Sequence, residues 1–172
     1  MSAARLNARR PTALAKIELL VLDVDGVLTD GRLYFGARGE ALKVFHVRDG
    51  HGIKLLMNAG VYVAAVSGRR SAAVAVRMRE LGVATVVQAC NDKVGALRRI
   101  AKRLAVPVLN CACMVDDTPD LPLMSAVGLA AAVADAHPLV KSAAHWVARA
   151  AGGCGAVREL CDEILRARAS FR

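Results

Sequence analysis

The sequence predicts an α/β domain with a doubly wound, Rossmann-like parallel sheet, a projecting β-hairpin and no lid domain. Short apolar runs of strand length alternate with helical segments, which is the order that builds parallel sheets. The first run, Leu19–Leu22, is continuously apolar and leads directly into two aspartates, as in a strand buried on both faces. The chain has 172 residues, 55% of them hydrophobic, which is enough for one domain with a sizeable core.

The other elements follow in order along the chain. Two runs around a Gly-rich turn, 32–35 and 41–45, predict the hairpin, and its two partly apolar faces need a packing partner. Helices are expected over 53–58, 72–81, 91–104, 119–126 and 155–169. Further strands are expected over 61–66, 84–87, 111–115, 129–133 and 146–147. The hairpin and one helix fill the stretch between the first two strands, which leaves no room there for an inserted lid.

The net charge of +9 comes mostly from the ends of the chain. Residues 1–16 hold four basic residues and residues 166–172 hold three, and neither segment contains an acid. We therefore expect a basic tail over 1–16, a domain over 17–166 and a second basic tail over 167–172. The body is nearly balanced in charge and aromatic residues are 3% of the chain, which argues against nucleic-acid binding.

The cysteines and the apolar runs indicate a cytoplasmic protein. Five cysteines without CxxC spacing favour neither a zinc site nor a disulfide framework. Cys111 and Cys113 are expected on one strand face as small hydrophobic residues. No segment has the pattern of a signal peptide or the length of a membrane span, so no membrane partner is expected.

Polar clusters follow three of the apolar runs, and a fourth opens a helix. They are Asp23/Asp25, Ser67, Asp116/Asp117 and Lys93. The carboxyl ends of parallel strands meet at one sheet edge, where ligands bind. A nucleophilic carboxylate, a second acid, a hydroxyl and a lysine for phosphoryl oxygens, and acids for Mg²⁺ are what phosphoryl transfer needs.

Each cluster also has a structural explanation. Ser67 could cap a turn, and the aspartate pair could cap the helix near Pro119. Lys93 is harder to explain in this way, because a cation in the first helical turn opposes the helix dipole. An anionic neighbour is therefore expected for Lys93.

These clusters, in order, resemble the four motifs of the haloacid dehalogenase superfamily. The matching segments are Asp23-Val-Asp25-Gly-Val-Leu-Thr-Asp30, Ser67-Gly-Arg69, Lys93 and Asp116-Asp117-x-x-Asp120. An acid at Asp25, two residues past the nucleophile position, is typical of the phosphatase branch.

From residue 17 to about 165 the sequence further resembles the 3-deoxy-D-manno-octulosonate 8-phosphate (KDO 8-phosphate) phosphatases, uncapped and homotetrameric members of that superfamily. The segments that carry this resemblance are Gly31-Arg-Leu-Tyr, Val47-Arg48-Asp49-Gly50-x-Gly52, Val133-Ala-Asp-Ala-His-Pro138 and Gly152-Gly-x-Gly-Ala-Val-Arg-Glu159. The resemblance implies Mg²⁺-dependent hydrolysis of KDO 8-phosphate through an aspartyl-phosphate, for lipopolysaccharide precursor synthesis.

The same resemblance assigns roles by position. Asp23 is the expected nucleophile and Asp25 the acid/base, with Ser67 and Lys93 on the phosphoryl group. Mg²⁺ is expected on Asp23, the backbone carbonyl of Asp25, and Asp116, while a contact of Asp117 or Asp120 with the metal stays open. Substrate contacts are expected from Asp25, His46, Val47, Arg48, Asp49, Gly50, Lys54, Arg69, Arg77 and Lys93.

The sequence departs from the family pattern at a few positions, and two other functions stay open. Val115 replaces a usual Gly and could crowd the metal loop, the segment 118–122 lacks a usual Trp, His46 replaces Asn, and Cys154 replaces Arg. One alternative is a phosphatase of nonulosonate (sialic-acid-type) 9-phosphates. The other is a non-catalytic phosphate-sensing or regulatory domain. A receiver-type sensor would require an acid at the end of the third strand, where Val86-Val87-Gln88 has none, and only Val115 favours a catalytically inactive regulatory domain.

Overall fold

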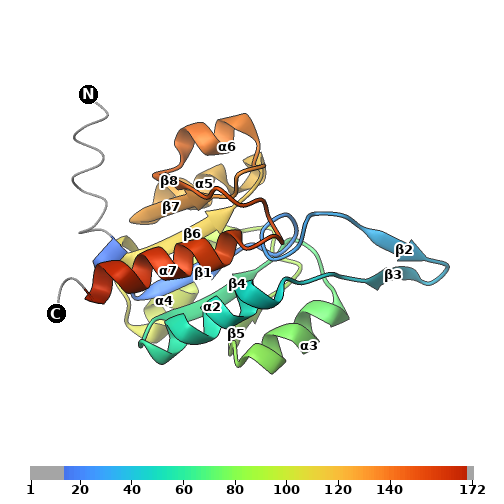
Figure 1. The fold of residues 1–172 in the computed structure, drawn as a ribbon, viewed down its shortest axis with the longest axis horizontal. Helices are drawn as coiled ribbons and strands as arrows, with labels where there is room; N and C mark the ends of the chain where they lie inside the picture. Colours follow the sequence, from blue (N-terminus) through green and yellow to red (C-terminus); the bar gives the residue numbers. More distant parts are fainter. Residues whose placement is uncertain (1–13, 170–172) are drawn as a thin grey trace.

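A six-stranded parallel sheet forms the centre of the fold (Figure 1). The computed structural model describes residues 14–169. The strand order is β5-β4-β1-β6-β7-β8, with β1 paired to β4 on one side and to β6 on the other. The strands are β1 (Leu19–Leu22), β4 (Tyr62–Val66), β5 (Thr85–Val87), β6 (Cys111–Val115), β7 (Leu129–Ala132) and β8 (Trp146–Val147). The predicted doubly wound sheet is confirmed.

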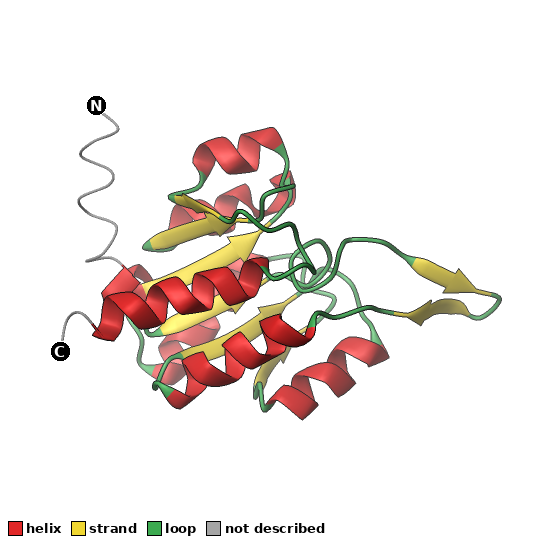
Figure 2. Cartoon of the chain, in the orientation of Figure 1, coloured by secondary structure: helices red, strands yellow, loops and turns green. Residues whose placement is uncertain are grey.

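Helices cover both faces of this sheet (Figure 2). On one face α2 (Val47–Asn58) and α7 (Ala156–Ala169) pack side by side, with α3 (Ala72–Leu81) next to α2. On the other face α4 (Lys93–Leu104) contacts α5 (Leu121–Ala126), which contacts α6 (Pro138–Ala143). Two short 3-10 turns, η1 (Val108–Asn110) and η2 (Thr118–Asp120), flank β6. Within the described residues, no helix is both long and apolar enough to cross a bilayer.

The core is centred on β1 and β6. No residue of β1 is more than 1% exposed, as its uninterrupted apolar run predicts for a strand covered on both faces. Cys111 and Cys113 are equally buried in β6, which confirms their role as small core residues. Burial raises the pKa of the Cys113 thiol to about 12, so this thiol is uncharged at neutral pH.

Helix α2 begins at Val47, six residues before the expected start at 53. His46 caps it, because its Nδ1 accepts a hydrogen bond from the backbone N–H of Arg48. Gly50 and Gly52 precede the expected start of the helix, but they lie inside α2, where neighbouring helices approach closely. A Cβ at Gly52 would lie 3.2 Å from the Cα of Arg158 in α7, and one at Gly50 would lie 2.9 Å from Leu81 in α3. Here close packing outweighs the low helix propensity of glycine.

The hairpin is present with shorter strands than expected. It consists of β2 (Tyr34–Gly36) and β3 (Gly39–Leu42), which pair with each other as a separate two-stranded sheet. It projects away from the helices that cover the large sheet (Figure 1). Its apolar side chains are exposed, Phe35 by 65% and Leu42 by 49%.

The folded region extends past the expected limits at residues 17 and 166. Leu14 is buried in the core, and α7 continues to Ala169. Arg168, which was expected in the C-terminal tail, donates a hydrogen bond of 2.7 Å to the carbonyl of Ile17. The rest of the two predicted tails, 1–13 and 170–172, lies outside the described residues. Helix α6 was not expected from the sequence.

The carboxylate of Asp49 ties α2 to the start of α7. It is buried and accepts hydrogen bonds from the backbone N–H of Arg158, at 2.8 Å, and of Gly155, at 3.2 Å. It therefore acts as an N-cap supplied from a different helix, since it satisfies two backbone donors at the beginning of α7.

Replacement of Asp49 by Ala should destabilise the protein by about 1–3 kcal/mol, because two buried N–H groups lose their acceptor. Urea denaturation followed by circular dichroism measures this change. Asp162→Ala is a matched control, because its half-exposed ion pair with Arg158 should contribute less than about 1 kcal/mol. Equal stability of the two variants would rule out the capping role.

Candidate active site

The predicted chemical residues meet at the carboxyl edge of the sheet. Asp23 follows β1, Ser67 follows β4, Asp116 follows β6, and Lys93 begins α4. All four line the same cavity, of about 650 Å³. The cavity lies where the strand order reverses around β1, the usual ligand position in open α/β sheets.

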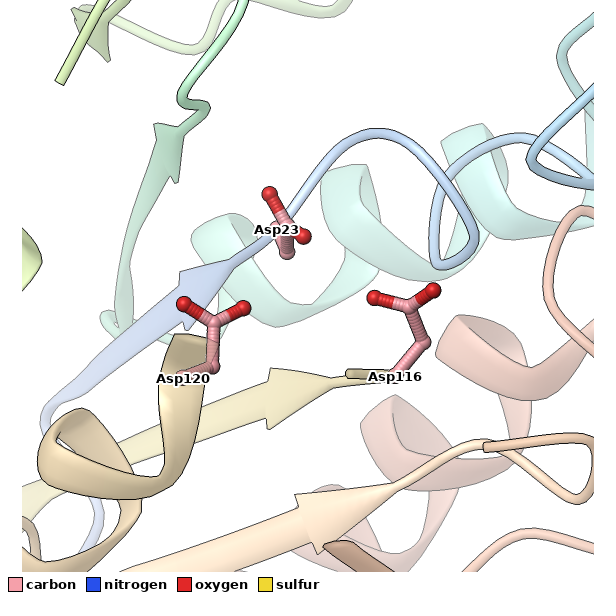
Figure 3. Close-up of side chains that lie close together, drawn as sticks. All are labelled: Asp23, Asp116 and Asp120. Atoms are coloured by element: carbon pink, nitrogen blue, oxygen red, sulfur yellow. The ribbon is translucent and has the colours of Figure 1, made fainter. Parts of the chain in front are cut away.

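Three of the carboxylates that line this cavity lie close together (Figure 3). Asp23, Asp116 and Asp120 each place an oxygen within 4.8 Å of the others. Asp23 extends from the end of β1, Asp116 from the end of β6 and Asp120 from the turn before α5. The sequence placed Asp120 in a motif without assigning it a role.

Lys93 has the anionic neighbours that its position at a helix start predicted. Its Nζ lies 3.0 Å from Asp23 Oδ1 and 2.8 Å from each oxygen of Asp120. These contacts raise the pKa of Lys93, although its burial acts in the opposite direction. Lys93 therefore remains a cation, and it holds the carboxylates of Asp23 and Asp120 in place.

The carboxylate cluster is short of positive charge. Burial, with a smaller contribution from Asp120, raises the pKa of Asp23 to about 6 even though Lys93 opposes the shift. Burial, followed by repulsion from Asp23, Asp117 and Asp120, raises the pKa of Asp116 to about 7. Ionising both groups would therefore be favoured by a further cation, and clustered carboxylate oxygens are the ligands of hard divalent ions such as Mg²⁺. The donor set fits such an ion.

The loop after β1 can approach Asp116 because residue 26 is glycine. Gly26 has a φ of +85°, and a Cβ there would lie 2.0 Å from Oδ2 of Asp116. Gly152 packs on the outside of the same loop, where a Cβ would lie 1.8 Å from the carbonyl oxygen of Gly26. The glycine run that includes Gly152 thus supports the loop that carries the two aspartates.

Two departures from the family pattern leave this geometry in place. Val115 is completely buried at the end of β6, and the carboxylate of Asp116 still lies against Gly26. The expected crowding of the metal loop is therefore not seen. Cys154 is exposed on the supporting glycine run and does not line the cavity.

Asp25 lines the same cavity and lies among polar and cationic groups. Ser67 Oγ donates to Asp25 Oδ2 at 3.4 Å, and the Nε of Arg69 lies 4.0 Å from the same oxygen. Ser67 Oγ also accepts from the backbone N–H of Arg69 at 3.1 Å, so the capping and site roles of this serine coexist. Lys43 forms an ion pair with Asp25 Oδ1. Nothing in the sequence pattern singled out Lys43, which reaches the site from the base of the hairpin.

Other expected substrate residues do not line this cavity. They are His46, Val47, Arg48, Asp49, Gly50, Lys54 and Arg77. Most lie on the first two turns of α2, where Val47, Arg48 and Lys54 are exposed. Arg77 of α3 packs beside Gly50 and forms an ion pair of 2.9 Å with Glu80.

Comparisons with known proteins agree with this geometry. The family model described as haloacid dehalogenase-like hydrolase matches residues 86–158. The 3-deoxy-D-manno-octulosonate 8-phosphate phosphatase KdsC of Escherichia coli (strain K12) is 47% identical over 152 residues, which cover 88% of this chain and 81% of the relative. The relative from Yersinia pestis is 46% identical over 154 residues.

Solved structures of such phosphatases share the fold over nearly their full length. The crystal structure of the Yersinia pestis phosphatase has a TM-score of 0.91 at 44% identity and covers 94% of this chain and 88% of its own. The crystal structure of the Moraxella catarrhalis phosphatase, in complex with magnesium ion, phosphate ion and KDO, has a TM-score of 0.91 at 33% identity. The match covers 99% of this chain and 95% of that phosphatase. The motifs meet at one edge of the sheet, and the identity to these phosphatases extends over most of both chains. The protein therefore belongs to the KDO 8-phosphate phosphatases, a family of haloacid dehalogenase-like hydrolases.

Proposed function

We propose that the protein is a Mg²⁺-dependent phosphoric monoester hydrolase that converts KDO 8-phosphate to KDO and inorganic phosphate. The observation that carries the proposal is the shared cavity of Asp23, Asp25, Ser67 and Lys93 in a chain 47% identical to a KDO 8-phosphate phosphatase. The Moraxella catarrhalis complex with KDO supports the substrate. We place the enzyme in the cytoplasm, in the synthesis of lipopolysaccharide precursors.

Asp23, Asp116 and the backbone carbonyl of Asp25 would hold Mg²⁺. A bound ion would supply positive charge against the phosphoryl oxygens, which would lower the barrier to attack by an anionic nucleophile. Asp120, whose oxygens contact Lys93, acts as the partner that fixes this lysine.

The chain's own groups account for the two chemical steps. Asp23 attacks phosphorus and becomes an aspartyl-phosphate, while Asp25 gives its proton to the leaving oxygen of the sugar. Asp25 then removes a proton from the water that hydrolyses the aspartyl-phosphate. Ser67 and Lys93 bind the phosphoryl oxygens throughout, because a hydroxyl and an ammonium are suitable donors to them.

We further propose that the sugar is bound by two groups of residues. Arg69 already lines the cavity of its own subunit. His46, Val47, Arg48, Gly50, Lys54 and Arg77 form the second group, with Asp49 holding the helix that carries most of them. In a homotetramer the hairpins would pair and cover neighbouring cavities, which would bring this second group to substrate.

Two alternatives are less well supported. A receiver-type sensor needs an acid at the end of the third strand of its parallel sheet, counted along the chain. In the six-stranded sheet this strand is β5, which ends in Val87 without an acid. A nonulosonate 9-phosphate is an acidic keto-sugar like KDO 8-phosphate, so the choice between the two substrates needs a direct assay.

Phosphate release from a substrate panel tests the proposed activity. We expect faster turnover of KDO 8-phosphate than of a nonulosonate 9-phosphate. Asp23→Asn should lower the rate by about a thousandfold or more, because the covalent route loses its nucleophile. Asp162→Asn, on the surface of α7, is the control and should keep full activity. More than a few per cent of wild-type activity in Asp23→Asn would refute the nucleophile assignment.

The raised pKa values predict that Mg²⁺ stabilises the protein more as the pH rises. Asp23 and Asp116 titrate near pH 6 and 7 in the metal-free fold but near 3.8 when unfolded, so between these values the folded state holds more protons. The metal-free protein should therefore lose stability as the pH rises through this range.

Mg²⁺ must displace these protons from the carboxylates, and fewer are bound at the higher pH. The increase in Tm that Mg²⁺ causes should therefore be larger at about pH 8 than at about pH 5.5. Thermal denaturation with Mg²⁺ or with EDTA measures both effects. Asp116→Asn should remove most of the Mg²⁺-dependent shift, and an increase in Tm that does not vary with pH would contradict the proposed metal site.

The exposed hairpin predicts a dependence of activity on assembly. Val44, at the base of the hairpin, is 53% exposed in the single chain, and an aspartate there would place a charge in the proposed interface. Val44→Asp should give smaller species in light scattering and lower activity on KDO 8-phosphate. Val76→Asp, at an exposed position of α3, is the control and should keep the wild-type assembly and activity. A wild-type monomer with full activity at micromolar concentration would exclude the proposed completion of the site by neighbours.

A further inference from the structure

Lys43 is buried at a point where its neighbours in sequence are exposed. It follows β3 at the base of the hairpin, and its side chain is only 2% exposed, whereas Leu42 and Val44 are about half exposed. A lysine is costly to bury unless its charge is paired. Its ammonium forms ion pairs with Asp25 Oδ1 and, at 3.1 Å, with Glu40 Oε2.

Glu40 connects this lysine to the loop after β4. One of its oxygens also accepts a hydrogen bond from Nη2 of Arg69 at 3.4 Å, and the other accepts from the hydroxyl of Ser71 at the start of α3. Its carboxylate therefore has partners on both the hairpin and the main domain. The position of the Lys43 ammonium is fixed from two sides, by Glu40 and by Asp25.

The consequence for Asp25 is that each oxygen has a defined partner. Oδ1 faces Lys43, and Oδ2 faces Ser67 and Arg69. The Asp25 side chain extends from the loop after β1 and is 20% exposed, so its polar contacts decide how the carboxyl group is rotated. General acid catalysis requires this group to be within hydrogen-bond reach of the leaving oxygen in a defined orientation.

We propose that Lys43 is a positioning residue which, held by Glu40, orients the Asp25 carboxyl group for proton delivery to the leaving oxygen. The inference rests on the proposed role of Asp25 as the acid. It adds a contribution from the hairpin to the chemistry of its own subunit, separate from the covering of a neighbour's cavity.

The leaving group reveals whether an acid is correctly placed. KDO leaves as an alkoxide unless it is protonated, whereas p-nitrophenolate is a stable anion and leaves without a proton. The ratio kcat/KM reports the steps up to the departure of this group. A badly oriented Asp25 should therefore lower kcat/KM for KDO 8-phosphate and leave p-nitrophenyl phosphate nearly unaffected.

Lys43→Met keeps the length of the side chain and removes its charge. We expect kcat/KM to fall by about tenfold to a hundredfold for KDO 8-phosphate and by less than about threefold for p-nitrophenyl phosphate. Lys43→Arg, which restores a cation, should recover most of the loss. Lys102→Met, an exposed lysine of α4, is the matched control and should behave like wild type on both substrates.

Asp25→Asn separates failure of this inference from failure of the proposed function. If Asp25→Asn loses both substrates equally, the acid assignment is wrong and the inference fails with it. The acid role instead requires Asp25→Asn to lower kcat/KM for KDO 8-phosphate much more than for p-nitrophenyl phosphate. If it does so, and Lys43→Met lowers kcat/KM equally for both substrates, or for neither, only the role of Lys43 is overturned. Light scattering establishes that the variants keep the wild-type assembly. Should Lys43→Met fail to fold, Glu40→Gln replaces it, and the same discrimination in weaker form is expected.

Discussion

The site depends on bringing carboxylates together that repel one another. Asp23 and Asp120 contact the ammonium of Lys93, and Asp116 lies in the same carboxylate cluster. Lys93 opposes the repulsion only in part, as the raised pKa values of Asp23 and Asp116 indicate. A flexible loop would relieve such repulsion by moving apart. Two adjacent buried strands prevent this, because β1 and β6 are hydrogen-bonded in register and end beside each other. The core thus holds the charged groups at a separation that suits a divalent ion.

The predictable part of the structure follows from local sequence. Continuous apolar runs such as Leu19–Leu22 identify buried strands, and polar residues directly after them mark the functional edge of a parallel sheet. The parallel sheet and the position of the cavity could be predicted in this way, and the place of Lys93 at a helix start predicted its anionic neighbours. The positions of Asp23, Ser67 and Asp116 at strand ends predicted that they would share a site, whereas their individual roles came from the family resemblance.

The rest was hidden because it depends on contacts between distant segments. Gly50 and Gly52 lie before the helix start that the sequence predicts, at 53, but they are helical residues packed against α3 and α7. Asp49 was assigned to substrate, yet its carboxylate binds backbone N–H groups more than a hundred residues further along the chain. Lys43 and Glu40 gave no signal, since nothing in a hairpin sequence reveals that its base folds back on a loop after another strand. Glycine and charged residues are ambiguous until their neighbours in space are known.

The central place of β1 also bears on how the chain folds during synthesis. Its partners are residues 62–66 on one edge and 111–115 on the other, so the ribosome must add much of the chain before both rows of backbone groups are paired. Until then Leu-Leu-Val-Leu is an uncharged, apolar strand with free edges, which is the type of segment that aggregates. The same four residues that set the geometry of the finished enzyme are thus exposed to aggregation while it is being made. Asp23 and Asp25, directly after the strand, place negative charge beside it and oppose self-association at that stage.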